Sequence, residues 1–155
     1  ITAVHLAGRN DVTIVRDGVV YENQTIGADG VHTFANSATA IDVIAGIPYT
    51  SRVRTLPFVD ARRGTVKGNP KRVSRVTVSL LDTRGAQVGM GDGPLVDMKD
   101  PLDEVGLSET RLRSGERNVP VRGTYDYYGE VVVSQSQPFP MTLLGIFSEM
   151  SVGDL

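Results

Sequence analysis

Few side chains in this sequence could perform acid–base or metal chemistry, and they are widely spaced. The chain has two histidines, His5 and His32, and no cysteine. A metal centre would need these histidines to share an ion with carboxylates such as Asp29 or Asp42. No close spacing of the HExxH type supports this, and isolated histidines are usually ordinary surface or core residues. We therefore expect no metal and no other cofactor.

Hydrolytic chemistry has equally little support. Paired carboxylates for glycoside cleavage are conceivable only at Asp126, which lies within a cluster of tyrosines. This tyrosine set is a candidate exposed aromatic contact and consists of Tyr125, Tyr127 and Tyr128. Aromatic residues at a turn of a β protein more often cover a sheet edge or form an interface. We predict that the protein is not an enzyme, and a carbohydrate-active enzyme using Asp126 or Asp42 is the weakest of three hypotheses.

Two further stretches resemble reactive motifs only in part. Ser51 is flanked by neither GxSxG nor SxxK, the contexts that activate a serine nucleophile. Gly89 to Gly93, GMGDG, is glycine-rich like a phosphate-binding loop, but no convincing helix start follows it. The acidic residues from Asp92 to Glu104 lack the DxDxDG spacing of a calcium loop. A solvated loop is the expected outcome here.

Positive charge gathers in one part of the chain. The net charge is −2, so any electrostatic partner must be met by a local patch. Such a patch is offered by the basic set, which consists of Arg52, Arg54, Arg62, Arg63, Lys67, Lys71, Arg72 and Arg75. These cations could bind phosphates, meet an acidic loop of a neighbouring subunit, or form a merely solvated face.

The elements that must position these residues are strands. Apolar and polar residues alternate over short stretches, and no helical stripe is found. The pattern predicts an all-β fold of short antiparallel strands in sandwich-like or barrel-like units, with little or no helix. Local turn signals include Asp17-Gly18, which predicts a hairpin, and Asp29-Gly30. A long strand is expected from Val73 to Leu81, closed by a turn at Asp82 to Gly85.

The later strands and the division into domains follow from similar signals. The last two strands are expected at Glu130 to Gln135 and at Met141 to Phe147. Composition shifts near Tyr49, which predicts a small β unit over residues 1–48 and a larger one over residues 49–155. The larger unit should carry an exposed basic loop at residues 60–70 and an acidic loop at residues 89–106.

Two general features complete the expectations. No apolar run approaches the ~18 residues that a membrane span needs, so we expect none. The chain begins with Ile1 rather than methionine, which favours a processed product or a segment of a longer protein. The stretch IPYTSRVRTLP, Ile47 to Pro57, alternates like a strand. One face would carry Tyr49, Ser51, Val53 and Thr55, and the other Thr50, Arg52, Arg54 and Leu56.

Four blocks of sequence are distinctive when they are taken together and in order. They are HLAGRNDVTIVRDG (5–18), GIPYTSRVRTLP (46–57), GTVKGNPKRVSRVTVSLLDTRGAQVG (64–89) and QSQPFPMTLLGIFSEMSVGD (135–154). These blocks resemble the C-terminal part of the tail nozzle proteins of short-tailed bacteriophages, the tail tubular protein B family. The resemblance spans nearly the whole chain, although the family's chain is several times longer and residues 91–117 match no pattern of it.

The resemblance implies a structural role and no catalytic residue. Family members form a β-rich ring of six copies below the adaptor ring, around the channel through which the genome leaves. It implies a homo-oligomer in the virion tail, assembled in the host cytoplasm, which contacts the adaptor ring and fibres and lets double-stranded DNA pass without specific binding. The basic set then becomes a candidate subunit interface or channel wall, and changing Arg52 and Arg54 to glutamate should weaken ring assembly. The alternative is a β-sandwich module that binds a glycan or receptor through the tyrosine set.

Overall fold

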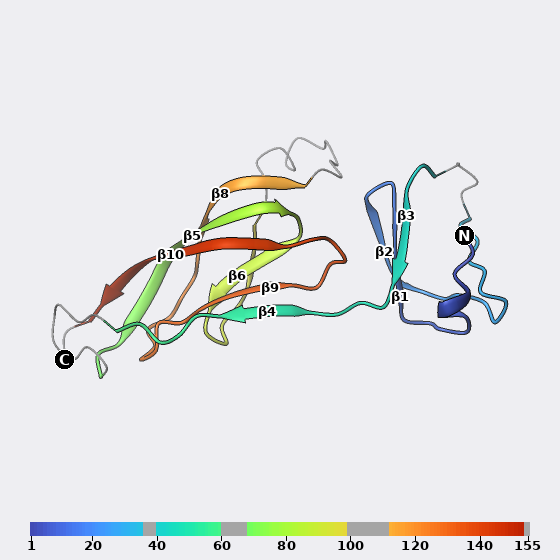
Figure 1. The fold of residues 1–155 in the computed structure, drawn as a ribbon. Coiled ribbons are helices and arrows are strands. Elements are labelled where there is room, and N and C mark those ends of the chain that lie inside the picture. The colour runs from blue at the N-terminus through green and yellow to red at the C-terminus, as the bar shows by residue number, and fades with distance from the viewer. Residues whose placement is uncertain (36–39, 60–67, 99–111, 154–155) are drawn as a thin grey trace. The chain divides into compact units, whose positions relative to one another are not determined.

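The computed structural model describes residues 1–35, 40–59, 68–98 and 112–153 (Figure 1). These residues form three antiparallel sheets and no α-helix, and the one helical turn, η1, is a 3-10 turn at Val4–Leu6. The predicted all-β class is therefore confirmed. Contacts divide the described residues into two compact units, of which the first contains Ile1–Tyr49 and the second contains most of the chain from Thr50 onward.

The first unit is built on a three-stranded sheet. Its strands are β1 (Val12–Arg16), β2 (Val19–Gln24) and β3 (Val43–Gly46), in the order β2-β1-β3. The turn between β1 and β2 has φ angles of 49° at Asp17 and 76° at Gly18. Two consecutive positive φ angles are typical of the hairpin turn that matches the right-handed twist of the strands. The predicted hairpin at this dipeptide is thus confirmed.

The core of the first unit lies on one side of its sheet. Its buried members are small and aliphatic, namely Ala3, Leu6, Val12, Ile14 and Ile26. The turn around Asp29-Gly30 packs close to this core, since the Ala3 N–H donates to the Gly30 carbonyl at 2.7 Å. Gly30 has φ 76°, and a Cβ there would lie 2.8 Å from the Val4 Cα, so this position requires glycine.

A three-stranded sheet forms one layer of the second unit. It consists of β10 (Thr142–Val152), β5 (Lys71–Thr83) and β8 (Arg113–Pro120), in the order β10-β5-β8. The register of β5 shifts against β10 next to Ser74 and against β8 just after Leu80. Each shift is a β-bulge, after which the strand has a buried residue again, Val76 after the first and Thr83 after the second.

Strands β5 and β10 both continue beyond their predicted ends. Asp82, with φ 44°, belongs to β5 and not to a turn, and its N–H donates to the Ser114 hydroxyl at 3.0 Å. The predicted turn at Asp82 to Gly85 therefore shrinks to Arg84 and Gly85. Strand β10 continues past Phe147 to Val152, because the early part of β5 is available for pairing along that length.

A four-stranded sheet forms the other layer. Its strands are β4 (Ser51–Arg54), β9 (Val131–Gln135), β6 (Ala86–Met90) and β7 (Val96–Asp97), in the order β4-β9-β6-β7. All five residues of β9 are buried, so this central strand is covered on both faces. The expected strand within residues 47–57 is confirmed as β4, an edge strand.

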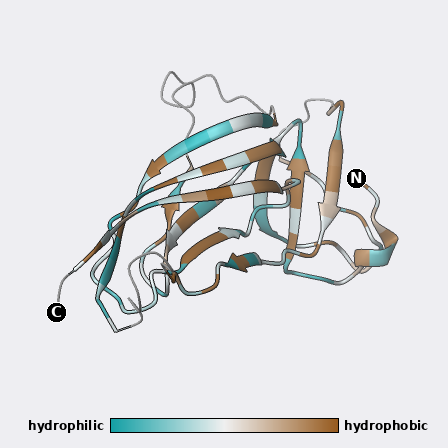
Figure 2. Ribbon diagram, turned by 60° about the vertical axis from the view of Figure 1, so that its left-hand side comes forward, coloured by the Kyte–Doolittle hydropathy of each residue, from teal (hydrophilic) through white to brown (hydrophobic). Residues whose placement is uncertain are grey.

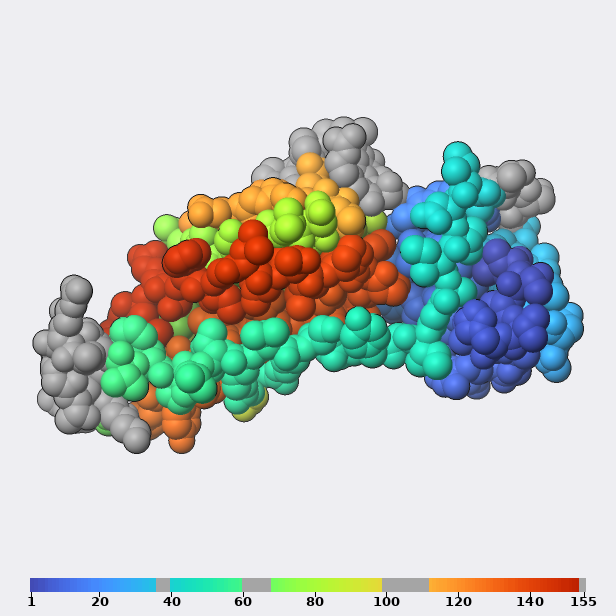
Figure 3. Space-filling view, viewed as in Figure 1, coloured from blue at the N-terminus to red at the C-terminus, as the bar shows by residue number. Residues whose placement is uncertain are grey.

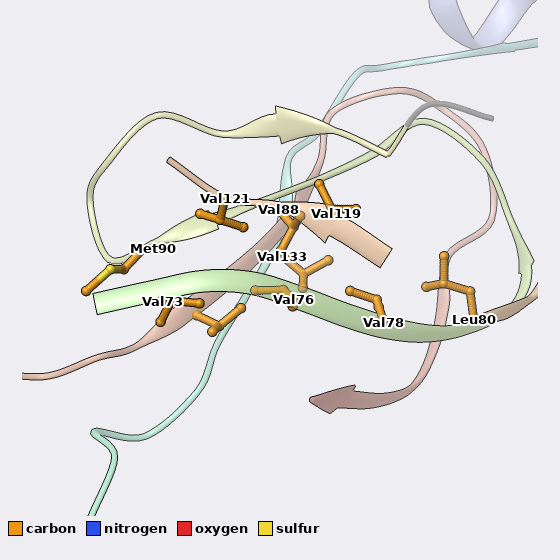
Figure 4. Close-up of a cluster of buried hydrophobic side chains, with 10 residues drawn as sticks. Val73, Val76, Val78, Leu80, Val88, Met90, Val119, Val121 and Val133 are labelled. Carbon is orange, nitrogen blue, oxygen red and sulfur yellow. The ribbon is translucent and has the colours of Figure 1, made fainter. Parts of the chain in front are cut away.

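The two layers close on a shared valine-rich core, which makes the second unit a β-sandwich. Alternate side chains of β5 point inward, and Figure 2 shows the matching alternation of hydrophobic and hydrophilic residues along the strands. Figure 4 shows these side chains meeting those of β6, β9 and the chain around β8. The core consists of Val73, Val76, Val78, Leu80, Val88, Met90, Val119, Val121, Val131 and Val133.

The two predicted loops are only partly described. Residues 60–67 of the basic loop and residues 99–106 of the acidic loop lie outside the described ranges. The acidic loop was placed too early, because Gly89 and Met90 are buried residues of β6. A Cβ on Gly89 would lie 2.7 Å from the Pro94 carbonyl oxygen, so the chain returning to β7 packs directly on this glycine. No helix in the described ranges is long and apolar enough to cross a membrane.

Candidate functional site

The two arginines of β4 lie on the outward face of the four-stranded sheet and form ion pairs across it. Arg52 Nη2 lies 3.5 Å from Asp92 Oδ1, and Arg54 Nη2 pairs with the same oxygen. Arg54 Nη1 also lies 3.3 Å from Glu130 Oε2. Arg54 therefore joins the turn after β6 to the start of β9, two segments that lie far from it in the sequence.

These ion pairs have a packing consequence. Arg54 is opposite Val132 in β9, and Val132 is opposite Gly89 in β6. Val132 is 0% exposed although it lies on the outward face, where Arg54 is its cross-strand neighbour. The aliphatic part of an arginine can cover apolar surface in this way while its guanidinium stays in contact with water. The β4 arginines thus have a structural role in the sandwich.

The remaining members of the basic set do not form one surface. Arg72 and Arg75 are exposed on the outward face of the three-stranded sheet, where Arg75 lies 3.7 Å from Glu149. Lys71 is 1% exposed, so its ammonium does not reach the surface that was predicted for it. Arg62, Arg63 and Lys67 lie outside the described residues. The described cations therefore divide between the two outer faces of the sandwich and its interior.

Lys71 holds the tyrosine segment in place. Its N–H donates to the Asp126 carbonyl at 2.6 Å, and the Asp126 N–H donates back to the Lys71 carbonyl at 2.8 Å. The buried ammonium donates to the Tyr127 carbonyl at 2.7 Å and to the Asn69 carbonyl at 3.1 Å. A further backbone bond joins the Phe58 N–H to the Tyr128 carbonyl at 2.9 Å. The segment is therefore tied to β5 and to the chain after β4.

The three tyrosine side chains are exposed, as predicted for an aromatic contact, but they do not act as one group. Tyr125, Tyr127 and Tyr128 are 58%, 62% and 59% exposed. Only Tyr128 lines the pocket described next. Arg54 of the basic set lines the same pocket, so one residue of the basic set and one of the tyrosine set lie at a common site.

This pocket lies wholly within the second unit and has a volume of about 520 Å³. Its walls come from residues 90–94, residues 122–124, Asp126, Tyr128, Glu130 and Arg54. Three glycines line it, and a Cβ on Gly123 would lie 2.7 Å from the Met90 sulfur. Glycine therefore keeps both the space of the pocket and the packing of Met90 beneath it.

Charge of both signs faces the pocket. Its lining includes two arginines, Arg54 and Arg122, and three acidic residues, Asp92, Asp126 and Glu130. The Arg54 group is neutralised by Asp92 and Glu130. Within the described part of the chain, the Arg122 guanidinium and the Asp126 carboxylate have no hydrogen-bond or ion-pair partner. These two groups are available to a ligand.

The histidines and carboxylates considered for a metal lie elsewhere. His32 Nδ1 is 2.8 Å from the Thr25 carbonyl oxygen, and its ring packs edge-on against Phe34 with centroids 4.8 Å apart. Over residues 1–35, 40–59, 68–98 and 112–153, no three histidine or carboxylate side chains lie close enough to hold a metal ion. The acids around the pocket are accordingly considered as hydrogen-bond acceptors.

Two carboxylates of the first unit have lowered pKa values. The N–H groups of Asp42 and Ile41 donate to Asp17 Oδ1 at 3.0 and 2.9 Å, and these bonds lower the pKa of Asp17. The pKa of Asp11 is lowered mainly by the hydrogen bond from Arg9, whose Nη2 lies 2.7 Å away. Asp17 thereby joins the β1–β2 turn to the chain entering β3.

The pocket was not predicted from the sequence. The sequence indicates Asp92 only as part of a possible phosphate or calcium loop, and it gives no functional signal for Arg122 or Glu130. Arg54 and Glu130 are 76 residues apart and meet only because β4 pairs with β9. The burial of Lys71 does have a signal in the sequence. Lys71 and Val73 are two residues apart, and this spacing places both on the buried face of β5.

No protein-family model matches the chain, and no curated protein sequence matches it.

Proposed function

We propose that the protein is a non-catalytic structural subunit of a short, non-contractile bacteriophage tail. In this proposal it is part of the nozzle ring, which has six copies in the resembling family and forms a section of the conduit for genome ejection. The proposal starts from the four ordered sequence blocks, and the all-β fold agrees with it. Its partners would be further copies, the adaptor ring and fibres, in virions assembled in the host cytoplasm.

The observation that carries an assembly role is a stretch of exposed apolar side chains. They lie between residues 41 and 59, and Ile41 and Leu56 are 98% and 87% exposed. The full set is Ile41, Ile44, Ile47, Tyr49, Val53, Leu56, Phe58 and Val59. Figure 3 shows residues 50–59 at the surface of the second unit, beside β10. Four of these side chains, from Val53 to Val59, belong to one short segment of the second unit, and exposed apolar surface of this kind marks protein–protein contacts.

The edge strands of the described sheets in the second unit also support an assembly role. Strands β4 and β7 form the two edges of one sheet, and β10 and β8 form those of the other. Edge strands present unpaired N–H and C=O groups that can pair with another chain. A closed ring needs heterologous contacts, in which two different surfaces of each subunit meet. A sandwich with four different edges can supply two such surfaces.

Three of the described arginines suit a conduit that does not grip DNA. Arg52, Arg54 and Arg75 each have a carboxylate within ion-pair distance. Phosphate binding strengthens with each cation that is free to neutralise a phosphate. Cations that are already paired, in a chain with a net charge of −2, let DNA slide past.

The experiment is an assembly assay on the purified chain together with labelling of phage particles. Sedimentation velocity and electron microscopy should show rings for the wild type and a shift to monomer for Leu56→Asp. Val4→Asp, at a residue that is 71% exposed in the first unit, is the matched control and should assemble normally. A wild type that stays monomeric at every concentration, together with antibodies that label no tail, would overturn the proposal.

Leu56 is a better test position than the β4 arginines. Because Arg52 and Arg54 are paired with Asp92 and Glu130, reversing their charges would also disturb the sandwich. A loss of rings in that variant would not separate assembly from folding. Leu56 is 87% exposed, so replacing it changes the surface of the second unit and leaves its core intact.

A further inference from the structure

The pocket of the second unit has the size and the preorganised walls of a ligand site. Its volume of about 520 Å³ lies within the range of small-molecule sites, roughly 300–1,000 Å³. The wall that carries Asp126 and Tyr128 is held by the backbone pair with Lys71 and by the bond from Phe58. The opposite wall is held by the Gly91 N–H, which donates to the Glu130 carbonyl at 2.9 Å. Walls fixed before binding reduce the entropy that a ligand must overcome.

The charges of the pocket select against ions. An anionic ligand would approach Arg122 but would also meet three carboxylates, of which Asp126 has no cationic partner among the described side chains. A metal cation would find no set of three suitable ligands within the described ranges. The free groups, one guanidinium and one carboxylate, balance each other. They fit an uncharged ligand that both donates and accepts hydrogen bonds.

Tyr128 adds an apolar requirement. Tyr128 lines the pocket and is 59% exposed, so it has surface that a ligand can contact. An aromatic ring offers a flat apolar surface with a polar hydroxyl at its tip. A sugar ring presents a flat patch of C–H groups to such a surface, and its hydroxyls can donate to a carboxylate and accept from a guanidinium.

We propose that this pocket binds an uncharged saccharide, of one or two sugar units, with Asp126 accepting from its hydroxyls, Arg122 donating to them and Tyr128 stacking on the ring. This site goes beyond the structural role proposed above and does not depend on ring formation. Lys71 is a positioning residue for it, because it holds the backbone that carries Asp126 and Tyr128.

The test is direct binding by the purified chain, measured by saturation-transfer NMR and calorimetry. The probes are maltose, cellobiose, lactose and chitobiose, with a sialylated lactose, inorganic phosphate and free glycine as charged comparisons. We expect at least one neutral disaccharide to bind. Asp126→Asn and Tyr128→Ala should each weaken that binding by about tenfold or more, since asparagine loses the negative charge and one acceptor oxygen and alanine removes the aromatic ring.

Two other tyrosines provide matched controls. Tyr125→Ala and Tyr127→Ala remove equally exposed rings that do not line the pocket, so both variants should bind like the wild type. Circular dichroism of every variant checks that the sandwich is intact. The proposal fails if no neutral saccharide binds the folded wild type, if only the charged probes bind, or if the control variants lose binding as strongly as Tyr128→Ala. None of these results depends on whether the chain forms rings.

Discussion

Replacing the buried Lys71 tests how the tyrosine segment is held. Lys71→Met keeps most of the side-chain length but removes two hydrogen bonds from the ammonium, to the carbonyls of Asn69 and Tyr127. Hydrogen bonds from a charged group are worth about 1.5–3 kcal/mol each, so the gross loss is about 3–6 kcal/mol. The methionine variant also avoids burying an ammonium, which costs several kcal/mol. We expect a net loss of about 2 kcal/mol in the free energy of unfolding.

A second substitution separates the ammonium from its stem. Lys71→Ala also deletes three carbon atoms that pack in the core, beside Gly129 and Met150. Methionine exceeds alanine by two carbons and a sulfur, so at about 0.8 kcal/mol for each buried methylene-sized group the alanine variant should be less stable than the methionine variant by about 2.4 kcal/mol. Both effects should be confined to the second unit, which contains Lys71.

The assay is urea unfolding followed by circular dichroism and by tyrosine fluorescence. The neighbouring Arg72 is exposed, so Arg72→Met is the matched control and should change stability by no more than about 0.5 kcal/mol. If Lys71→Met were as stable as the wild type, the two ammonium hydrogen bonds would contribute nothing net. If the methionine and alanine variants were equally stable, the packing of the stem would be refuted.

Two further predictions concern charge. Asp17→Asn should reduce the loss of stability in acid, measured as the melting temperature from about pH 5 to pH 2. Because the folded-state pKa of Asp17 is lowered, its ionised carboxylate stabilises the fold fully above the unfolded-state pKa of about 3.9. That stabilisation is lost as the pH falls through the folded-state pKa. An unchanged acid limb would contradict the role of its backbone hydrogen bonds. Arg54→Glu should destabilise the second unit by about 1–2 kcal/mol at low salt, and less at high salt, because it places a third carboxylate beside Asp92 and Glu130. Adding Asp92→Arg should restore part of that loss, and no recovery would show that the ion pair contributes little.

Much of the fold could be predicted because its signals are local. The Asp17-Gly18 hairpin depends on two residues that accept positive φ, and the all-β class depends on alternation within single strands. The ends of β5 were less predictable. Its bulges near Ser74 and Asp82 arise from pairing with β10 and β8, which lie many residues away. Local patterns carry no information about the register of such distant partners.

The candidate site was predictable only as separate parts. Composition identified the basic stretch and the tyrosines, and the exposure of Tyr128 agrees with the aromatic contact that was expected. It did not indicate that Lys71 is buried or that Arg54 is already paired. Whether a charged side chain faces water, a partner or the core depends on which strand packs above it.

The sequence by itself therefore determined the class of fold, the hairpin and the residue types that could form contacts. Those properties follow from backbone preferences and from hydrophobic periodicity, which act over a few residues. The tertiary structure alone decided that Arg54, Asp92, Asp126 and Tyr128 surround one pocket. The reason is physical: the order of β4, β9 and β6 in their sheet and the hydrogen bonds of Lys71 bring these distant residues together, and both depend on long-range pairing.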